Sequence, residues 1–431
     1  MAGRKGHGGI GCVATACVLG SMAGAAAAES WDLQAKLTSP EPAKNARFGT
    51  SVSLSGSLGV VGTSKRAAVY QDTGTEWVRR QTLTPSDPQP SSSRFGDAVA
   101  VSGDVIVVGA PDHSVFNDYN GGAYVFERTD QGWAESQKLL PGDALELDVF
   151  GLSVALSGTT VLVGSDQRAA GSPSYEYYGA VYVYRKVGDL WLLSAKLKPQ
   201  GAAAGDDFGC AVAVCDNIAV IGAKGMGSTG AAYVFQDAGD GWIQAARLTP
   251  TDGASYDDFG ASVAISGTTV VVGSPTNDAA GTNAGAAYVY RYTPLGWQQI
   301  DRLAPSDADR DDRFGASVAI DGTAIIVGAE AGGDGPVSSG SAYVFEETPG
   351  GWVETTEILP ADGWYGDRFG ACLALSAADV IIGAMEHDHV ASNAGAAYIY
   401  GVPEPCSLCL LAAGALAMLR RRSETARRDG R

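Results

Sequence analysis

Acidic side chains at alternating positions are the residues whose types and spacing best suit a bound cation. Asp307, Asp309 and Asp311 alternate within the acidic segment 307–312. Carboxylate oxygens arranged in this way suit a hard cation such as Ca²⁺. The segment lacks the glycine at the sixth position and the glutamate at the twelfth position of an EF-hand loop. We therefore favour the alternative that these aspartates close turns by accepting hydrogen bonds from backbone N–H groups. We expect no cofactor, with calcium as the one alternative.

Two neighbouring histidines form a second candidate metal site. His387 and His389 flank Asp388 and could hold a metal ion if another loop supplied a third ligand. An exposed polar loop explains the same pattern, and we favour that interpretation. The chain contains no Gly-x-Ser-x-Gly elbow, His-Glu-x-x-His helix or P-loop, so the sequence predicts no enzyme. The two carboxylates of a glycosidase can meet in space without any sequence spacing, which keeps an enzyme as an alternative.

Aromatic residues in three connections of variable length are the candidates for binding a partner. They are His113, Phe116 and Tyr119 in residues 111–122, Tyr175, Tyr177 and Tyr178 in residues 172–178, and Trp364 and Tyr365 in residues 363–366. Exposed aromatic rings could stack on sugars or anchor a protein partner. Ordinary packing within the loops is the alternative, because single exposed aromatic residues are common.

The elements that must position these residues belong to a repeat. A Phe-Gly step occurs seven times, at Phe48, Phe95, Phe150, Phe208, Phe259, Phe314 and Phe369. Fourteen residues after each of these phenylalanines stands a glycine, such as Gly273 after Phe259. A strand of small and aromatic residues follows, as in residues 287–290. Last comes a tryptophan with Leu or Ile six residues later, an even spacing that places both side chains on one face of a strand.

Each repeat unit is therefore predicted to contain four strands. Residues 259–265 and 270–273 are nearly all apolar and are joined by a tight turn at Gly267, so we expect these two strands to be covered on both faces. Residues 352–358 alternate between apolar and polar types, which is typical of a half-exposed outer strand. This gradient from an apolar first strand to a polar fourth strand is what a propeller blade requires.

An offset of one strand predicts that the repeats close into a ring. A tryptophan segment at residues 31–37 precedes the first Phe-Gly step, and none follows Tyr400 after the last. We predict an all-β, seven-bladed β-propeller in which residues 31–37 complete the blade that begins at Phe369. An open solenoid would need polar caps instead. The second-to-third and fourth-to-first strand connections then emerge on one rim, where variable loops on a repeated scaffold usually bind ligands.

The N-terminal segment has the pattern of an export signal. Basic Arg4 and Lys5 precede a small apolar run over residues 10–24 and four alanines that end at Ala28. This pattern predicts a signal peptide over residues 1–28 that a signal peptidase removes. The alternative, a retained transmembrane helix, needs about 20 apolar residues.

The C-terminal segment carries a second signal. Pro403-Glu404-Pro405 is followed by an apolar stretch over residues 406–419 and by three arginines at residues 420–422. This order resembles the PEP-CTERM sorting signal of bacteria, which implies processing by an exosortase. A plain C-terminal anchor is the alternative, although the stretch is shorter than the about 20 residues that span a bilayer. Both imply transient or permanent membrane attachment. The domains expected are 1–28, the propeller 29–402 and the segment 403–431.

Composition narrows the function classes. The chain has 431 residues and a formal net charge of −18. The two end segments hold eight basic and three acidic residues, so the mature chain is more acidic still, which argues against a nucleic-acid partner. Cys210 and Cys215 lie five residues apart in one predicted strand, which separates them by about 16 Å. This is too far for a disulfide, so we expect these two and Cys372 to be buried free thiols.

The repeat resembles a known family. The Phe-Gly step with Val-Gly-Ala-Pro at residues 108–111 or Val-Gly-Ser-Pro at residues 272–275 is similar to the FG-GAP repeats of the integrin alpha chain propeller and its bacterial relatives. The resemblance spans residues 31–400 and implies a seven-bladed propeller with an extracellular binding role. Integrin-type repeats often carry an Asp-x-Asp-x-Asp-Gly calcium loop between the first and second strands. Here that connection is a short turn such as residues 102–104, so those calcium sites are not expected.

These observations predict a non-catalytic bacterial protein that is exported to the cell surface or the extracellular matrix. Its rim loops would bind an extracellular protein or a glycan, as in adhesion. Two alternatives stay open. One is an extracellular carbohydrate-active enzyme that uses rim carboxylates, and the other is a purely structural component of a surface layer.

Overall fold

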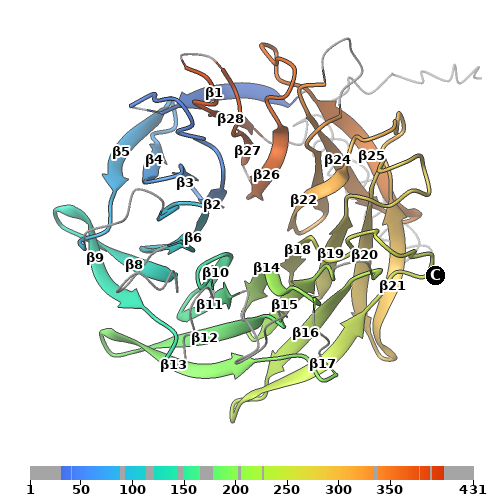
Figure 1. Cartoon of the computed structure of the whole chain (residues 1–431), viewed down its shortest axis with the longest axis horizontal. Helices are drawn as coiled ribbons and strands as arrows, with labels where there is room; N and C mark the ends of the chain where they lie inside the picture. The colour runs from blue at the N-terminus through green and yellow to red at the C-terminus, as the bar shows by residue number, and fades with distance from the viewer. Residues whose placement is uncertain are drawn as a thin grey trace, which may run out of the picture. The chain divides into compact units, whose positions relative to one another are not determined.

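The computed structural model describes residues 31–39, 41–87, 93–112, 121–142, 149–165, 178–201, 205–225, 228–332, 338–377, 379–388 and 391–401. These residues form seven four-stranded antiparallel sheets, which surround a common axis as the blades of a propeller (Figure 1). The predicted all-β, seven-bladed fold is confirmed. The predicted signal peptide and C-terminal signal lie outside the described residues. Among the described residues there is no helix with the length and apolar character to span a bilayer.

The blades are numbered in chain order, and each is built from strands that pair in sequence from the axis outward. Blade 1 contains β2 (Val52–Ser55), β3 (Leu58–Gly62), β4 (Ala67–Asp72) and β5 (Trp77–Leu83). Blade 2 contains β6 (Ala98–Ser102), β7 (Val105–Ala110), β8 (Gly122–Thr129) and β9 (Gly132–Leu139). Blade 3 contains β10 (Val154–Ser157), β11 (Thr160–Ser165), β12 (Ala180–Val187) and β13 (Leu190–Leu197). Blade 4 contains β14 (Phe208–Cys215), β15 (Ile218–Ala223), β16 (Ala231–Asp237) and β17 (Trp242–Leu248).

The remaining blades follow the same plan until the last. Blade 5 contains β18 (Ser262–Ser266), β19 (Thr269–Ser274), β20 (Ala286–Thr293) and β21 (Gly296–Leu303). Blade 6 contains β22 (Phe314–Asp321), β23 (Ala324–Ala329), β24 (Ser341–Thr348) and β25 (Gly351–Ile358). Blade 7 contains β26 (Phe369–Leu375), β27 (Asp379–Ala384), β28 (Ala396–Gly401) and, as its outer strand, β1 (Asp32–Thr38).

The two ends of the described chain meet in blade 7. β1 pairs antiparallel with β28, with Lys36 opposite Tyr398 and Leu37 opposite Ala397. In Figure 1 the blue β1 lies beside the red β28 at the closure of the ring. The ring is therefore closed by strand pairing between segments more than 350 residues apart, as the offset of the tryptophan segments predicts.

Within a blade, the inner strands are more buried than the outer strand, as predicted, but the first strands are less buried than expected. The second strands are fully buried, as in β19 and β27, or buried except for their first residue, as in β7, and the fourth strands alternate, as in β25. The first strands were expected to be covered on both faces, but most residues of β14, β18 and β26 are only half-buried. The reason is their position: a first strand is the inner edge of its sheet and borders the axis of the ring, so no further strand pairs with it on that side (Figure 1).

The two glycine motifs of the repeat are the two sides of one contact between neighbouring blades. A Cβ added to Gly273 of β19 would stand 2.0 Å from the carbonyl oxygen of Gly315, the glycine of the next Phe-Gly step. Gly315 has φ +93°, a conformation that glycine adopts without steric cost. The same approach to the next blade, at 1.9–2.3 Å, recurs at Gly62, Gly109, Gly164, Gly222, Gly328 and Gly383. Neighbouring blades therefore pack through direct backbone contacts that leave no room for a side chain.

A belt of side-chain hydrogen bonds supports the same contact. Ser262 Oγ donates to the carbonyl of Gly315 at 2.8 Å, and Ser317 Oγ donates to that of Gly370 at 2.6 Å. The thiol of Cys372 continues the belt across the closure to Gly49. Further members are Ser51 to Gly96, Ser153 to Gly209 and Cys210 to Gly260. The belt ties the start of the first strand to the following blade in six of the seven blades, and blade 2 has Ala98 at the equivalent position.

The three cysteines of the propeller are free thiols, as predicted. As whole residues they are half-buried rather than fully buried, because they lie in first strands near the axis. The thiol groups of Cys210 and Cys372 are enclosed against the next blade, and this burial raises the pKa of Cys210 to about 11 and that of Cys372 to about 12.

Candidate binding site

The second-to-third and fourth-to-first connections lie together on one rim. Backbone hydrogen bonds join the two kinds of loop, as in Tyr256 N–H to Ser228 O at 3.0 Å and Phe259 N–H to Thr229 O at 3.0 Å. The same pairing links Gly366 N–H to Ser338 O at 3.0 Å. The loops that vary most in sequence are therefore held against one another by the repeated backbone.

The rim carries exposed aromatic side chains. Trp364 and Tyr365, which precede β26, are 68% and 75% exposed. Tyr256 occupies the corresponding connection before β18 and is 70% exposed, and it is a candidate that was not predicted from the sequence. Tyr178 is half-buried at the entry to β12. The other candidates lie outside the described residues: His113, Phe116, Tyr119, Tyr175, Tyr177 and His389.

The alternating aspartates hydrogen-bond within their own rim. Asp311 accepts hydrogen bonds from Asn283 Nδ2 at 2.8 Å and from Arg310 Nε at 3.1 Å. The bond from Asn283 holds the pKa of the Asp311 carboxyl below its usual value. Asp309 accepts a hydrogen bond from the backbone N–H of Arg310, while Asp307 lies at the start of the same loop. In the part of the chain that the structure describes, no three His, Cys, Asp or Glu residues gather as a metal site would require.

His387 does not lie in an exposed loop, contrary to the interpretation favoured from the sequence. Its side chain is 5% exposed and sits between two charged partners. Nδ1 lies 2.7 Å from Asp367 Oδ2, and Nε2 lies 2.9 Å from Lys36 Nζ. Asp362 Oδ2 stands 3.9 Å from Nε2. The sequence missed this network because Lys36 comes from the other end of the chain.

The same network contains a tyrosine, a carboxylate and a basic side chain from three segments. Tyr398 of β28 donates its hydroxyl hydrogen to Asp362 Oδ1 at 2.8 Å. Lys36 of β1 forms an ion pair with Asp362 and lies 5.3 Å from the centroid of the Tyr398 ring. Burial alone would raise the pKa of Asp362, but the hydrogen bonds from Lys36 and Tyr398 outweigh it and hold the pKa below its usual value. This arrangement is called the rim triad below.

The rim triad recurs in full in blade 2, and its pair of a tyrosine and a basic residue recurs at the same register in further blades. In blade 2, Tyr124 donates to Asp87 at 2.9 Å and Lys138 pairs with the same carboxylate at 2.5 Å. The tyrosine of the third strand faces the basic residue of the fourth strand in five blades, as Tyr398 and Lys36, Tyr124 and Lys138, Tyr182 and Lys196, Tyr233 and Arg247, and Tyr288 and Arg302. Blade 6 keeps the tyrosine, Tyr343, and faces it with Glu357.

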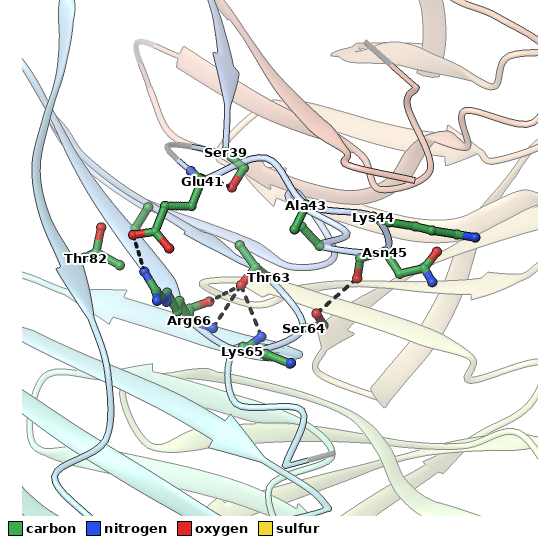
Figure 2. Close-up of a pocket in the computed structure, with 12 residues that line it drawn as sticks. Ser39, Glu41, Ala43, Lys44, Asn45, Thr63, Ser64, Lys65, Arg66 and Thr82 are labelled. Atoms are coloured by element: carbon green, nitrogen blue, oxygen red, sulfur yellow. Dashed lines mark hydrogen bonds and ion pairs between the residues drawn. The ribbon is translucent and has the colours of Figure 1, made fainter. Parts of the chain in front are cut away.

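Blade 1 departs from this pattern, and a cavity results. At the register of the triad Ala68 faces Thr82, so both the phenol and the basic side chain are missing. The space there is a cavity of about 170 Å³, called the blade 1 pocket (Figure 2). It is lined by Ser39, Glu41, Ala43, Lys44, Asn45, Ala46, Thr63, Ser64, Lys65, Arg66, Ala68 and Thr82.

A second hollow lies on the opposite rim, between blades 1 and 2. It measures about 520 Å³ and is lined by Arg80, Gln81, Arg128 and Trp133 among others. Gln81 spans the two blades, because its side-chain amide donates to Trp133 O at 2.7 Å and accepts from Trp133 N–H at 2.8 Å. The amide therefore fixes the two outer strands side by side and leaves the arginines at the edge of the hollow.

The profile of the FG-GAP repeat matches seven segments of the chain, at residues 31–75, 77–126, 133–184, 191–235, 242–290, 297–345 and 352–400. The chain belongs to the FG-GAP repeat family. Each matched segment runs from the outer strand of one blade into the first three strands of the next, so the family repeat and the structural blade are offset by one strand. No curated protein matches the chain significantly.

A solved structure is similar in fold. It is a chain of the "Crystal Structure of Mitotic Checkpoint Complex", with 12% sequence identity, a TM-score of 0.55, and coverage of 87% of this chain and 94% of that chain. At this identity the similarity concerns the propeller fold alone.

Proposed function

We propose that this FG-GAP propeller is an exported, non-catalytic binding protein of the cell surface or the extracellular matrix. Its loop-bearing rim would bind an extracellular protein or a glycan, in the manner of an adhesion module. Membership of a family that is typical of extracellular and surface proteins supports this proposal. The export signal over residues 1–28 and the PEP-CTERM-like segment 403–431 support it from the sequence, with signal peptidase and an exosortase as processing partners.

One observation carries the proposal: Trp364 and Tyr365 are exposed on a connection that is otherwise fixed. Asp367 Oδ2 accepts the backbone N–H of Trp364 at 2.7 Å, and His387 holds the same carboxylate. Gly366 is tied to the neighbouring loop through Ser338. Large aromatic rings on a preorganised loop lose little conformational entropy when they bind, so they suit a binding hot spot.

The test is binding by the full-length chain to an array of glycans and to candidate surface proteins. The double variant Trp364→Ala, Tyr365→Ala is expected to lose at least about tenfold in affinity for the ligand found, which corresponds to about 1.4 kcal/mol. Tyr292→Ala is the matched control, because Tyr292 is also exposed, at 57%, but lies in β20 toward the opposite rim. Unchanged binding by the double variant would exclude these residues as the hot spot.

An assay of polysaccharide hydrolysis by the same protein tests the alternative that it is an enzyme. Hydrolysis of a polysaccharide that disappears when Asp307 or Asp309 is replaced by Asn would replace the binding proposal with a catalytic one. Binding without turnover is the result that the proposal requires.

A further inference from the structure

We propose that the blade 1 pocket binds one carboxylate-bearing sugar residue, such as a uronic acid unit of an acidic polysaccharide. This narrows the proposed function to one site and one ligand class, and it rests on that function only in taking the ligand to be a glycan. The pocket lies on the same rim as Trp364 and Tyr365, since Ser39 to Ala46 belong to a fourth-to-first connection and Thr63 to Arg66 to a second-to-third connection.

In the other blades, a tyrosine side chain occupies the position that corresponds to the blade 1 pocket. In each of them a tyrosine is the third residue of the third strand, and in blades 2 and 7 its hydroxyl bonds to an aspartate of a rim loop. Ala68 replaces that tyrosine in blade 1, and Thr82 replaces the basic residue opposite it. The cavity of about 170 Å³ is therefore close to the size of a six-membered ring with substituents, since about 150 Å³ already holds benzene.

The charge around the pocket is opposite to that of the protein. Residues 36–82 contain seven Lys or Arg and three Asp or Glu, whereas the whole chain contains 30 basic and 48 acidic residues. The lining itself has Lys44, Lys65 and Arg66 against one acidic residue, Glu41. Within the described residues neither Lys44 nor Lys65 forms an ion pair. An anionic ligand is thus attracted to this part of an otherwise repulsive rim.

The basic residues come from loops that are held in place. Thr63 Oγ1 accepts the backbone N–H of Lys65 at 3.2 Å and of Arg66 at 2.9 Å, which fixes the turn that presents both side chains (Figure 2). Ser64 Oγ donates to Asn45 O at 3.2 Å and so ties this turn to the loop that carries Lys44. The hydroxyl groups of Ser39 and Thr82 complete a lining that suits the hydroxyl groups of a sugar.

One basic side chain of the pocket, Arg66, already forms an ion pair with a carboxylate of the protein, that of Glu41. Glu41 Oε1 lies 2.7 Å from Arg66 Nη1, and the Glu41 side chain is 69% exposed (Figure 2). An exposed side chain is displaced at little cost, because surface ion pairs contribute about 0–1 kcal/mol. The carboxylate of a bound uronic acid takes the place of Glu41 on Arg66, and Lys65 and Lys44 add to its attraction. Glu41 is therefore a competitor whose removal strengthens binding.

The test uses calorimetric binding of trigalacturonate to the full-length chain, with its methyl ester and sodium sulfate as separate probes. We expect trigalacturonate to bind, the neutral ester to bind at least about tenfold more weakly, and affinity to fall as ionic strength rises. The variant Ala68→Tyr, which restores the residue of the other blades, is expected to abolish binding. Lys65→Gln is expected to weaken it, and Glu41→Gln to strengthen it several-fold.

The controls separate this site from the proposed function. Arg128→Gln removes a basic side chain from the opposite rim and is expected to bind as the unaltered chain does, and thermal unfolding checks that Ala68→Tyr is folded. Trigalacturonate binding that is absent, or that persists in Ala68→Tyr, overturns the inference, as does equally tight binding of sulfate alone. Neither result affects the hot spot test, because Trp364→Ala, Tyr365→Ala is judged on other ligands.

Discussion

Lys36 of β1 and His387 of the β27–β28 connection meet at the closure of the ring, with 2.9 Å between Lys36 Nζ and His387 Nε2. An ammonium group can only donate, so Nε2 is the acceptor and the ring proton is on Nδ1. Nδ1 then donates to Asp367 Oδ2 at 2.7 Å. The contact thus defines the tautomer of the histidine and connects the first strand of the chain with the last blade.

A first prediction concerns the replacement of His387 by asparagine. Blade 5 has Asn277 at the same place, where Nδ2 donates to Asp257 Oδ2 at 2.8 Å and Oδ1 accepts from Arg302 at 2.9 Å. Asparagine thus supplies the same donor and the same acceptor as the histidine tautomer. His387→Asn is expected to change the free energy of unfolding by less than about 1 kcal/mol. His387→Ala, which leaves buried Asp367 without this donor, is expected to cost about 1–3 kcal/mol.

Denaturant unfolding measures both changes at pH 7. If the alanine and asparagine variants were equally destabilised, the hydrogen bonds of His387 would have no part in holding the rim loop.

A second prediction concerns the ion pair of the closing strand. Lys36→Met removes the partner of Asp362 and the donor to His387 while keeping the aliphatic stem over Tyr398. Because Asp362 is half-exposed, the expected loss of stability is only about 1 kcal/mol. The loss falls on β1, which is held to blade 7 by pairing rather than by chain continuity. Hydrogen exchange of the β1 amides is expected to speed up, whereas Lys138→Met in blade 2 leaves β1 protected.

A third prediction gives the sign of a pH dependence. Burial raises the pKa of Asp379, and the charge of Asp72 raises it further, against a hydrogen bond from Gln34. A raised pKa means that the folded chain binds this proton more tightly than the unfolded chain, so stability falls as the pH rises above the usual range near 3.9. Asp379→Asn removes the buried charge and is expected to raise the melting temperature at pH 7. The gain should shrink as the pH is lowered toward about 4.

The control for this measurement is Asp130→Asn, which alters an exposed carboxylate of a β-turn. A gain for Asp379→Asn that is the same at pH 7 and pH 4 would show that the carboxylate is not protonated more readily in the folded chain.

A fourth prediction tests the glycine contact between blades. In Gly273→Ala the new Cβ would stand 2.0 Å from the carbonyl oxygen of Gly315, and both partners are backbone that cannot move aside. We expect a loss of more than about 3 kcal/mol or failure to fold, as for severe overpacking. Gly142→Ala is the control, since nothing lies within 4 Å of its Cβ position. Circular dichroism and thermal unfolding of the two variants decide the matter.

A fifth prediction concerns the thiol of the hydrogen-bond belt. Cys372 Sγ donates to Gly49 O at 3.0 Å, and burial raises its pKa to about 12. The folded protein is therefore expected to keep this thiol from alkylation at pH 8, where the thiolate is scarce. Cys372→Ser should retain stability, because Ser262 and Ser317 make the same bond in their blades. Cys372→Val should lose about 1 kcal/mol, measured by denaturant unfolding.

The sequence by itself determined the number of blades, the strand order and the closure. The Phe-Gly step, the glycine fourteen residues later and the tryptophan of the outer strand are local features, and each unit repeats them at nearly fixed spacing. A repeat unit cannot bury its apolar faces alone, so seven like units and one extra strand lead to a closed ring. The sequence also placed Trp364 and Tyr365 in a variable loop as binding candidates, and the structure shows that both side chains are exposed.

Only the tertiary structure decided which side chains meet. The rim triad joins a loop that enters the blade, its third strand and its fourth strand, and in blade 7 that fourth strand comes from the start of the chain. The sequence predicts that His387 lies in an exposed loop, whereas the structure shows that it contacts Lys36 and Asp367. The blade 1 pocket depends on Ala68 and Thr82 facing each other, a pairing set by the register beyond a bulge between β4 and β5. Strand register and ring closure bring together side chains that are distant in sequence. These contacts cannot be predicted from the composition or the spacing of the residues, because both describe the chain only locally.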